Sequence, residues 1–420
     1  MTKHMLAGTA LAALLAAGAT QPALADCTTT IGVVMSLTGP AGPYGQAGAK
    51  SVEMAFRDIN AAGGVLGCKL VTETRDAQSQ GTVAVDGAKQ LVEITHVPAI
   101  IGGIISSVSI PMLTAVTAPA HVVQVSPASS SPTLTTLGME GKTNGMFFRT
   151  ITSDALQSVA AARYAVDLGL KKVAIIHVNN DFGVNMAREF TAAYKALGGT
   201  VTSTTRYNEK SANYDAEVTS AMEGSPDALY LMSYPIDGAT IARAWISKGG
   251  PRKFLLTDGM NSADFIDAVG AKYLNEAYGT SSGTEDGPST AYFNANYKAF
   301  SNLDPGSPAA VQAYDAGAIV GLAVAAGGAA TSAAIRDGIY KVTDPKGEVV
   351  YAGEFKKALD LLKAGKPIRY VGVIGPISFD QYGDITGPFR EWAIQDGKIV
   401  TKGQLTTADV DKIKATIAGK

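Results

Sequence analysis

The fold is decided by the stretch IGVVMSLTGPAGPYG at residues 31–45. Its apolar first part, 31–37, is typical of a buried strand, and its Gly- and Pro-rich second part predicts a loop that ends in Tyr44-Gly45. Apolar residues then recur at helical spacing until Gly63-Gly64, and a second strand is predicted at 70–73. This order of strand, loop, amphipathic helix and strand is the building unit of a parallel sheet.

The same unit recurs in the second half of the chain. A strand at 173–178 precedes a polar loop ending in Phe182-Gly183, and a helical stripe then leads to Gly198-Gly199 and a strand at 201–205. An internal repeat of a whole βαβ unit predicts two similar α/β lobes, each with a parallel sheet covered by helices. The remainder, from about 281, is predicted to hold three or four helices and one strand at 377–380, and to complete the two lobes.

Length and composition exclude several classes of protein. The 420 residues suggest two to three domains, and the 46% of apolar residues suffice for sizeable cores. A formal charge of −2, with no basic block, gives no support to nucleic-acid binding. Four histidines and two cysteines leave little material for a metal site, so we expect no metal and no other cofactor. Neither HExxH nor GxxxxGK[ST] occurs, and we expect no enzyme activity.

Residues 1–25 are predicted to be a cleaved signal peptide. Lys3 supplies the basic start, 6–18 the apolar region, and Ala23-Leu24-Ala25 the small-residue cleavage site before Asp26. The expected location is therefore the periplasm. A second apolar stretch, at 316–330, is Gly- and Ala-rich and predicts a buried helix instead of a membrane span.

Cys27 has two interpretations. Leu24-Ala25-Asp26-Cys27 resembles a lipoprotein signal, although Asp26 stands where such signals require a small residue. Cys27 and Cys68 also each precede a predicted strand, so they would meet at one sheet edge if these strands are parallel neighbours. In an oxidising compartment that pair favours a disulfide. We expect the disulfide, with a lipid anchor at Cys27 as the alternative.

The loops at the carboxyl ends of the predicted strands carry the candidate ligand contacts, because ligands of open α/β sheets bind at that edge. Serines before a helix offer hydroxyls and free N–H groups that suit a carboxylate. The structural alternatives are that these serines and the acidic residue cap helices and that the aromatic residues fill the core. Two serine clusters at one edge favour ligand contact. The candidates are Tyr44, Ser106, Ser107, Ala128, Ser129 and Ser130 in the first lobe and Phe182, Tyr234 and Asp258 in the second.

These motifs resemble those of the periplasmic branched-chain amino acid binding proteins, the Leu/Ile/Val-binding group of type I solute-binding proteins. The resemblance runs through 31–40, DINAAGGVLG at 58–67, Ser126-Pro127-Ala128 and YGDITGP at 382–388. It implies two Rossmann-like lobes that are joined by three crossovers and close on a ligand. The implied lobes are 26–151 plus 282–376 and 152–281 plus 377–420.

The resemblance also implies roles for individual residues. Ser106 corresponds to the serine that binds the ligand carboxylate, and the Ala128 carbonyl and the Ser130 hydroxyl to groups that hold the α-amino and carboxylate groups. Asp258 corresponds to the acid that binds the ammonium group, and Phe182 and Tyr234 to aromatic walls. Two positions depart from the family pattern: Asp258 stands for the usual glutamate, and Phe182 for a common tyrosine.

The sequence thus predicts a monomeric substrate-capture protein of an ABC importer, with a permease and its ATPase as partners. A ligand with both a carboxylate and an ammonium group satisfies both lobes, so we expect a small amino acid with an aliphatic or aromatic side chain. One alternative is an aromatic or other small carboxylic acid or amide, with Asp258 turned away as a helix cap. Another is a ligand-sensing module of the same fold.

Overall fold

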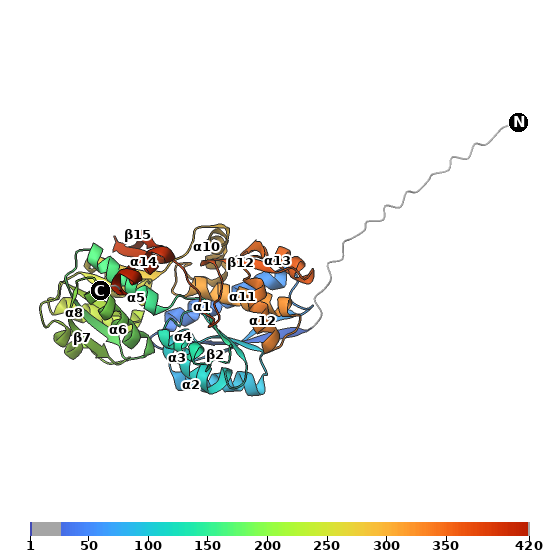
Figure 1. Ribbon diagram of the computed structural model, residues 1–420, viewed down its shortest axis with the longest axis horizontal. Helices are drawn as coiled ribbons and strands as arrows, with labels where there is room; N and C mark the ends of the chain where they lie inside the picture. Colours follow the sequence, from blue (N-terminus) through green and yellow to red (C-terminus); the bar gives the residue numbers. More distant parts are fainter. Residues whose placement is uncertain (2–26, 419–420) are drawn as a thin grey trace.

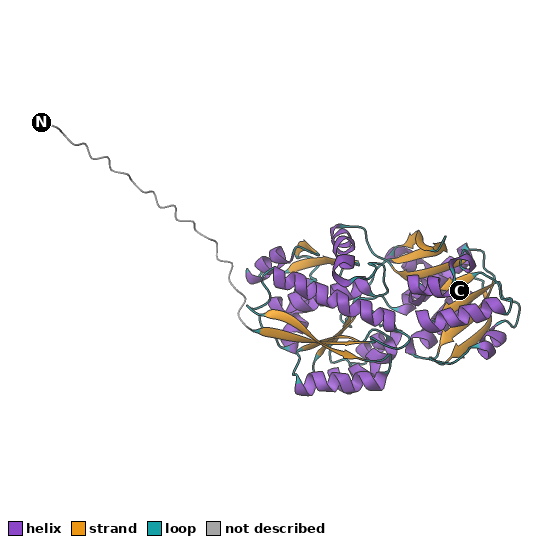
Figure 2. Cartoon of the chain, turned by 180° about the vertical axis from the view of Figure 1, so that it is seen from behind, coloured by secondary structure: helices purple, strands orange, loops and turns teal. Residues whose placement is uncertain are grey.

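The computed structural model describes residue 1 and residues 27–418. The predicted signal peptide and its cleavage site lie outside the described residues, apart from Met1. The chain forms two α/β lobes that lie side by side (Figure 1). In each lobe the strands are enclosed between helices (Figure 2). The predicted fold class, two α/β lobes with mainly parallel sheets, is confirmed.

The first lobe is built on a sheet of five parallel strands in the order β2-β1-β3-β4-β5. Helices α1, α11 and α12 cover one face, and α2 and α3 cover the other. The bounds are β1 (Thr28–Met35), α1 (Gly42–Ala61), β2 (Lys69–Asp76), α2 (Gly81–Lys89), β3 (Ala99–Gly102), α3 (Ser106–Met112), β4 (Val123–Ser126), α4 (Pro132–Met139), β5 (Phe147–Arg149), α11 (Ala310–Gly327) and α12 (Ser332–Val342).

The second lobe is built on a seven-stranded sheet in the order β15-β14-β10-β9-β8-β6-β7. Neighbouring strands pair in parallel except at one edge, where β14 pairs antiparallel with both β10 and β15. Helices α5 and α6 pack on one side, and α7 and α8 on the other. The bounds are α5 (Asp154–Asp167), β6 (Lys172–Val178), α6 (Asp181–Ala196), β7 (Thr200–Tyr207), α7 (Asp215–Ala221), β8 (Ala228–Met232), α8 (Pro235–Ser247), β9 (Phe254–Leu256), α9 (Ala263–Val269), β10 (Ala277–Ser282), β14 (Phe389–Gln395), β15 (Lys398–Leu405) and α14 (Thr407–Ala418).

A small third sheet, β11-β12-β13, lies beside the first lobe with α10 and α13. The bounds are α10 (Pro288–Ser301), β11 (Glu348–Tyr351), α13 (Phe355–Lys363), β12 (Ile368–Gly372) and β13 (Gly375–Pro376).

Helix α11 forms the centre of the first lobe. Within the described residues it is long and apolar enough to span a membrane, but 78% of it is buried, and it packs between α1 and α12. The helix predicted from the apolar stretch 316–330 is therefore a core helix, as expected.

Three segments of chain pass between the lobes, at about 150–153, 283–287 and 377–388. They lie together, because Thr152 forms a parallel bridge with Ile385 and the Gly283 N–H donates to the Pro388 carbonyl oxygen at 2.7 Å. The strands of the first sheet fall within 26–151, and those of the second mostly within 152–281 and 377–420. The exact lobe boundaries stay a prediction.

The prediction for the C-terminal part was partly wrong. Residues 377–380 form no strand but belong to the third crossover, and five helices and five strands follow residue 282. Ile377 and Phe379 are buried and alternate with exposed residues, which imitates the period of a strand. That alternation comes from packing, because the Phe379 ring meets Phe148 edge to face at 5.3 Å.

The predicted disulfide between Cys27 and Cys68 is present, with the two Cα atoms 4.9 Å apart. It joins the starts of β1 and β2, which pair in parallel from Thr28 and Lys69 onward. The disulfide was expected on the condition that the two strands are parallel neighbours, and β1 and β2 meet that condition. Lipid attachment would need the Cys27 sulfur that this bond occupies.

Candidate ligand site

A small cavity of about 10 Å³ lies where loops at the carboxyl ends of the two sheets meet. Seven of the nine predicted contacts line it: Tyr44, Ser106, Ala128 and Ser130 from the first lobe, and Phe182, Tyr234 and Asp258 from the second. Ile104 and Ile105 complete the lining. Segments far apart in the sequence thus converge on one point, while the ligand roles of these residues stay a prediction.

The lobes are closed against one another around this cavity. The Tyr44 ring of the first lobe meets Tyr234 of the second edge to face at 6.4 Å, and Tyr234 stacks on Phe182 at 5.8 Å. Beside them, the Asn185 side-chain amide donates to the hydroxyls of Ser131 and Thr133 across the gap, at 3.2 and 3.3 Å. Aromatic contact and hydrogen bonds therefore hold the two lobes in a closed arrangement.

The repeated aromatic–glycine pair has a physical reason. A Cβ atom at Gly45 would lie 1.9 Å from the Ser36 carbonyl oxygen, and one at Gly183 would lie 2.2 Å from that of Val178. In both lobes the first helical turn thus passes so close to the end of the preceding strand that only glycine fits. This close approach places the preceding aromatic residue, Tyr44 or Phe182, at the edge of the cavity.

The four candidate serines, Ser106, Ser107, Ser129 and Ser130, do not cap helices. Helix α3 begins with Ser106, its N-cap residue is Ile105, and no side chain caps it. The Ser106 oxygen accepts a hydrogen bond from the Ser131 N–H at 3.1 Å, which leaves its hydroxyl hydrogen free to donate into the cavity. Ser131, and not Ser130, caps α4.

Ser107 and Ser129 do not line the cavity. Ser129 is buried beneath it and its hydroxyl meets that of Ser109 at 2.7 Å, so it supports the serine loop from behind.

Asp258 does not cap a helix either, because the N-cap residue of α9 is Ser262. One carboxylate oxygen accepts a hydrogen bond from the Gln157 side chain at 3.3 Å. The carboxylate borders the cavity but protein surrounds it, and burial raises its pKa to about 6, although the bond from Gln157 opposes the rise.

A second acidic residue, Asp154, was missed by sequence reasoning. It is fully buried at the start of α5, and neither carboxylate oxygen has a hydrogen-bond partner. Burial raises its pKa well above the usual value and the charge of Asp258 adds to the rise, while Ser130 and Arg149 oppose it. In the sequence, Ser153-Asp154 follows the pattern of an ordinary helix start, and Ser153 does cap α5. What distinguishes Asp154 from an ordinary residue at a helix start is its closeness in space to Asp258, whose charge raises its pKa.

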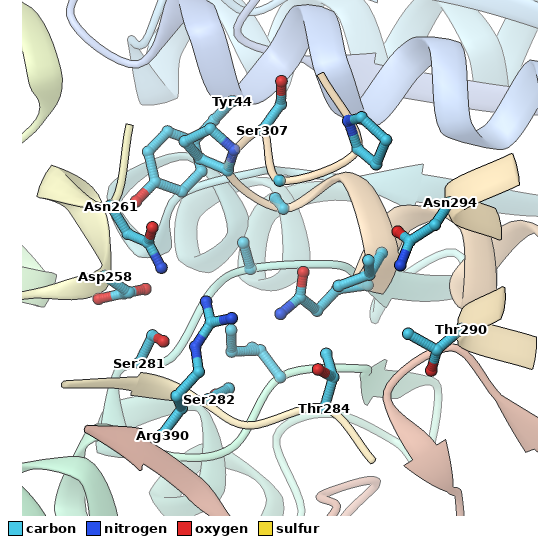
Figure 3. A pocket seen from close by; sticks show the side chains of 18 of the residues that line it. Tyr44, Asp258, Asn261, Ser281, Ser282, Thr284, Thr290, Asn294, Ser307 and Arg390 are labelled. Atoms are coloured by element: carbon cyan, nitrogen blue, oxygen red, sulfur yellow. The ribbon is translucent and has the colours of Figure 1, made fainter. Parts of the chain in front are cut away.

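A larger cavity of about 320 Å³ adjoins the small one, with Tyr44, Ala128 and Asp258 on the wall of both. Its other walls are largely polar and come from both lobes and two crossovers (Figure 3). Arg390 of β14, which the sequence did not single out, points its guanidinium group into the middle of this space (Figure 3).

The larger cavity offers no sign of a serine hydrolase. Residues 279–283, GTSSG, fit the pattern GxSxG, but Ser281 lies on β10 near its end and no strand–turn–helix elbow follows it directly. None of the residues that line either cavity is a histidine. The general base that such a serine requires is therefore missing from these walls.

The comparison with known proteins agrees with this geometry. Residues 28–361 match a family model described as periplasmic binding protein. A Leu/Ile/Val-binding protein homolog of Brucella melitensis is 28% identical over 95% of this chain and 99% of its own length. A substrate-binding protein of a chemotactic signal transduction system, BasB of Halobacterium salinarum, is 26% identical over 83% of this chain and 82% of its own.

Two solved structures share the fold. The leucine-binding protein LivK of Thermotoga maritima superposes with a TM-score of 0.77 at 22% identity, over 91% of this chain and 99% of its own. A solute-binding protein of R. palustris in complex with 4-hydroxybenzoate superposes with a TM-score of 0.73 at 19% identity, over 92% of this chain and all of its own. The two-lobe architecture, the convergence of both sheets on one cavity and the matched family model lead to one assignment: the chain belongs to the periplasmic binding protein family.

Proposed function

We propose that this protein captures an amino acid between its lobes outside the cytoplasm and delivers it to an ABC importer. One observation carries the proposal: the half-buried Asp258 carboxylate lines the same cavity as Ser106 and Ser130, and the fully buried Asp154 lies near enough for the charge of Asp258 to raise its pKa. A buried carboxylate without a cationic partner is costly, and a ligand ammonium group would supply that partner.

The two ends of an amino acid match the two sides of the cavity. The hydroxyls of Ser106 and Ser130 suit the α-carboxylate, and Asp258, with the Ala128 carbonyl oxygen, suits the α-ammonium group. Because the charge of Asp258 raises the pKa of Asp154, a ligand cation would relieve that repulsion as well as the desolvation. Carboxylate, hydroxyls and ammonium would then all be satisfied in a space that excludes water.

The aromatic wall supports carbon atoms next to the α-carbon. Tyr44 and Tyr234 pack edge to face and Phe182 stacks on Tyr234, so their rings would enclose an apolar part of the ligand. The Phe182 ring cannot donate a hydrogen bond, and Tyr234 already accepts one from the Asn180 amide at 3.2 Å. An aliphatic or aromatic amino acid stays the expectation from the sequence.

The transport role follows from the two-lobe form. Ligand that bridges both lobes favours the closed arrangement, which a membrane permease and its ATPase would recognise. The protein would act as a monomer in the periplasm, be exported by a cleaved signal peptide and catalyse no reaction.

Small-angle scattering with and without ligand tests the capture model. A saturating amino acid should reduce the radius of gyration and raise the melting temperature. At 100 times the dissociation constant, the added stability is about 2.7 kcal/mol. An unchanged scattering profile at saturation contradicts closure.

Two further functions have specific support. The R. palustris relative holds 4-hydroxybenzoate, which favours an aromatic acid as the alternative ligand. Calorimetry on both ligand classes with Asp258→Ala separates them, because only an amino acid needs that carboxylate. The name of the Halobacterium relative favours ligand sensing as the alternative role. Genes for a permease and an ATPase beside this one would favour transport.

A further inference from the structure

The small cavity has no room for the side chain of an amino acid. Its free volume is about 10 Å³, whereas ligand pockets typically span about 300–1,000 Å³. The cavity of about 320 Å³ shares Tyr44, Ala128 and Asp258 with it and lies next to it. A ligand anchored at Asp258 and the serine hydroxyls therefore has to extend its side chain into this larger space, called the side-chain chamber below.

The side-chain chamber is unsuited to an aliphatic group. Three polar atoms on its wall are buried and have no hydrogen-bond partner: the hydroxyl oxygens of Ser281 and Ser282 and Nε of Arg390. Ser281 is 5% exposed. A polar ligand group would satisfy these atoms once their side chains turn to meet it, whereas a branched hydrocarbon would not, and each buried polar group without a partner costs free energy.

Arg390 gives the chamber its charge. The ion pairs found among residues 27–418 do not include it, and burial lowers its pKa without any opposing acidic neighbour. The other charged residues that line the chamber are Asp258, at the shared wall, and Asp286, which is exposed. In Figure 3 the guanidinium group points into the middle of the side-chain chamber.

We propose that the ligand is an amino acid with a negatively charged side-chain end, and that Arg390, with Ser281 and Ser282, recognises that end. This inference rests on the proposed amino-acid capture and names the class of amino acid. It replaces the expectation of an apolar side-chain end but keeps the aromatic wall for the carbon atoms before it. Each charged group of the ligand then has a partner: the ammonium group Asp258, the side-chain anion Arg390, and the α-carboxylate the hydroxyls of the first lobe.

Calorimetry with L-glutamate, L-glutamine, L-leucine and benzoate tests this on the full mature protein and two variants. Arg390→Ala removes the cation, and Arg252→Ala is the matched control, because Arg252 is exposed in the second lobe and lines neither cavity. We expect L-glutamate to bind the native protein most tightly. Loss of one side of a desolvated charge pair should weaken it about 30- to 5,000-fold in Arg390→Ala. Arg252→Ala should bind as the native protein does.

The neutral ligands show whether Arg390→Ala still folds. Its affinity for L-glutamine should fall far less than that for L-glutamate, and Arg390→Lys should restore part of the loss. Tightest binding of L-leucine, unchanged in Arg390→Ala, would overturn this inference and leave amino-acid capture standing. Binding of benzoate alone, undiminished in Asp258→Ala, would overturn the amino-acid class itself.

Discussion

Asp258 should make ligand affinity depend on pH in the slightly acidic range. Burial in the closed arrangement raises its pKa to about 6. A ligand ammonium group binds the ionised form, so protonation competes with binding. The apparent dissociation constant therefore rises by the factor 1 + 10^(6 − pH), which is about 1.1 at pH 7 and about 11 at pH 5. We expect affinity to fall about tenfold between these values.

The ligand's own groups and Glu209 should not produce this dependence. Asp154, whose pKa burial also raises, remains in the variant Asp258→Asn, so that variant separates the two carboxyl groups. An α-carboxyl group titrates near 3.5, a glutamate side-chain carboxyl group near 4.3 and an α-amino group near 8, so the charges of the ligand largely persist from pH 5 to 7. Glu209 has a pKa raised to about 7 by burial, but it does not line the cavity. The variant Asp258→Asn isolates the effect: it should bind weakly and with a flat profile.

Calorimetry at half-unit steps from pH 5 to 7 measures the curve, with the tightest amino acid of the panel as ligand. Asp286→Asn is the matched control, because Asp286 is exposed and lies on the wall of the side-chain chamber only. It should keep the native pH dependence. A flat native profile, or a tenfold fall that survives in Asp258→Asn, would refute the role of Asp258 as ammonium acceptor.

Three further predictions concern stability. Reduction of the Cys27–Cys68 disulfide, which spans 41 residues, should cost about 4 kcal/mol in urea unfolding, and two free thiols in the denatured, unreduced protein would show that the bond is absent. Asp384→Ala should lower the free energy of unfolding by about 3–5 kcal/mol, because the fully buried Arg149 guanidinium loses the carboxylate that lies 2.6 Å from it. A loss below 1 kcal/mol would contradict this. Burial raises the pKa of Asp315 to about 7, so the folded state binds its proton more tightly than the unfolded state, and stability should fall as pH rises from about 4 to 7. Asp315→Asn should flatten that slope in melting curves, and an equally steep slope in the variant would exclude Asp315 as its source.

Much of the fold could be predicted because buried parallel strands are short apolar runs. Strands β1, β3 and β6 are of this kind, and the glycine after Tyr44 and Phe182 marks both helix starts. The antiparallel edge could not be predicted in this way. Strand β15 has no buried residue and carries no apolar run, and β5 has only three residues.

Part of the candidate site could be predicted from the sequence, and part could not. Loop residues such as Ser106 and Asp258 follow predicted strands, so the edge-of-sheet rule located them. Asp154 and Arg390 lie on a helix after a crossover and on an antiparallel strand, and their position depends on how three chain segments cross between the lobes. Sequence spacing carries no information about that crossing. Of the charged groups that would select the ligand, Asp258 was therefore predicted from the sequence, and Arg390 and Asp154 were not.

The third crossover is anchored to the first lobe at Asp384, and the chain just before this crossover is anchored at residues 373 and 374. These two anchors limit where the hinge can bend. The Arg149 guanidinium donates to the carbonyl oxygens of Ser129 and Ser131 at 3.2 and 3.0 Å and pairs with Asp384. Farther back, the Asp315 carboxylate accepts hydrogen bonds from the backbone N–H groups of residues 373 and 374.

Both anchors lie before residue 385, so the crossover up to Asp384 moves with the first lobe and with the serine loop. Beyond it, Phe389 already pairs with β10 of the second lobe. Only residues 385–388, with the neighbouring Thr152 and Gly283, remain to absorb the change of angle. Arg149 therefore joins the serine loop to the fixed end of the hinge.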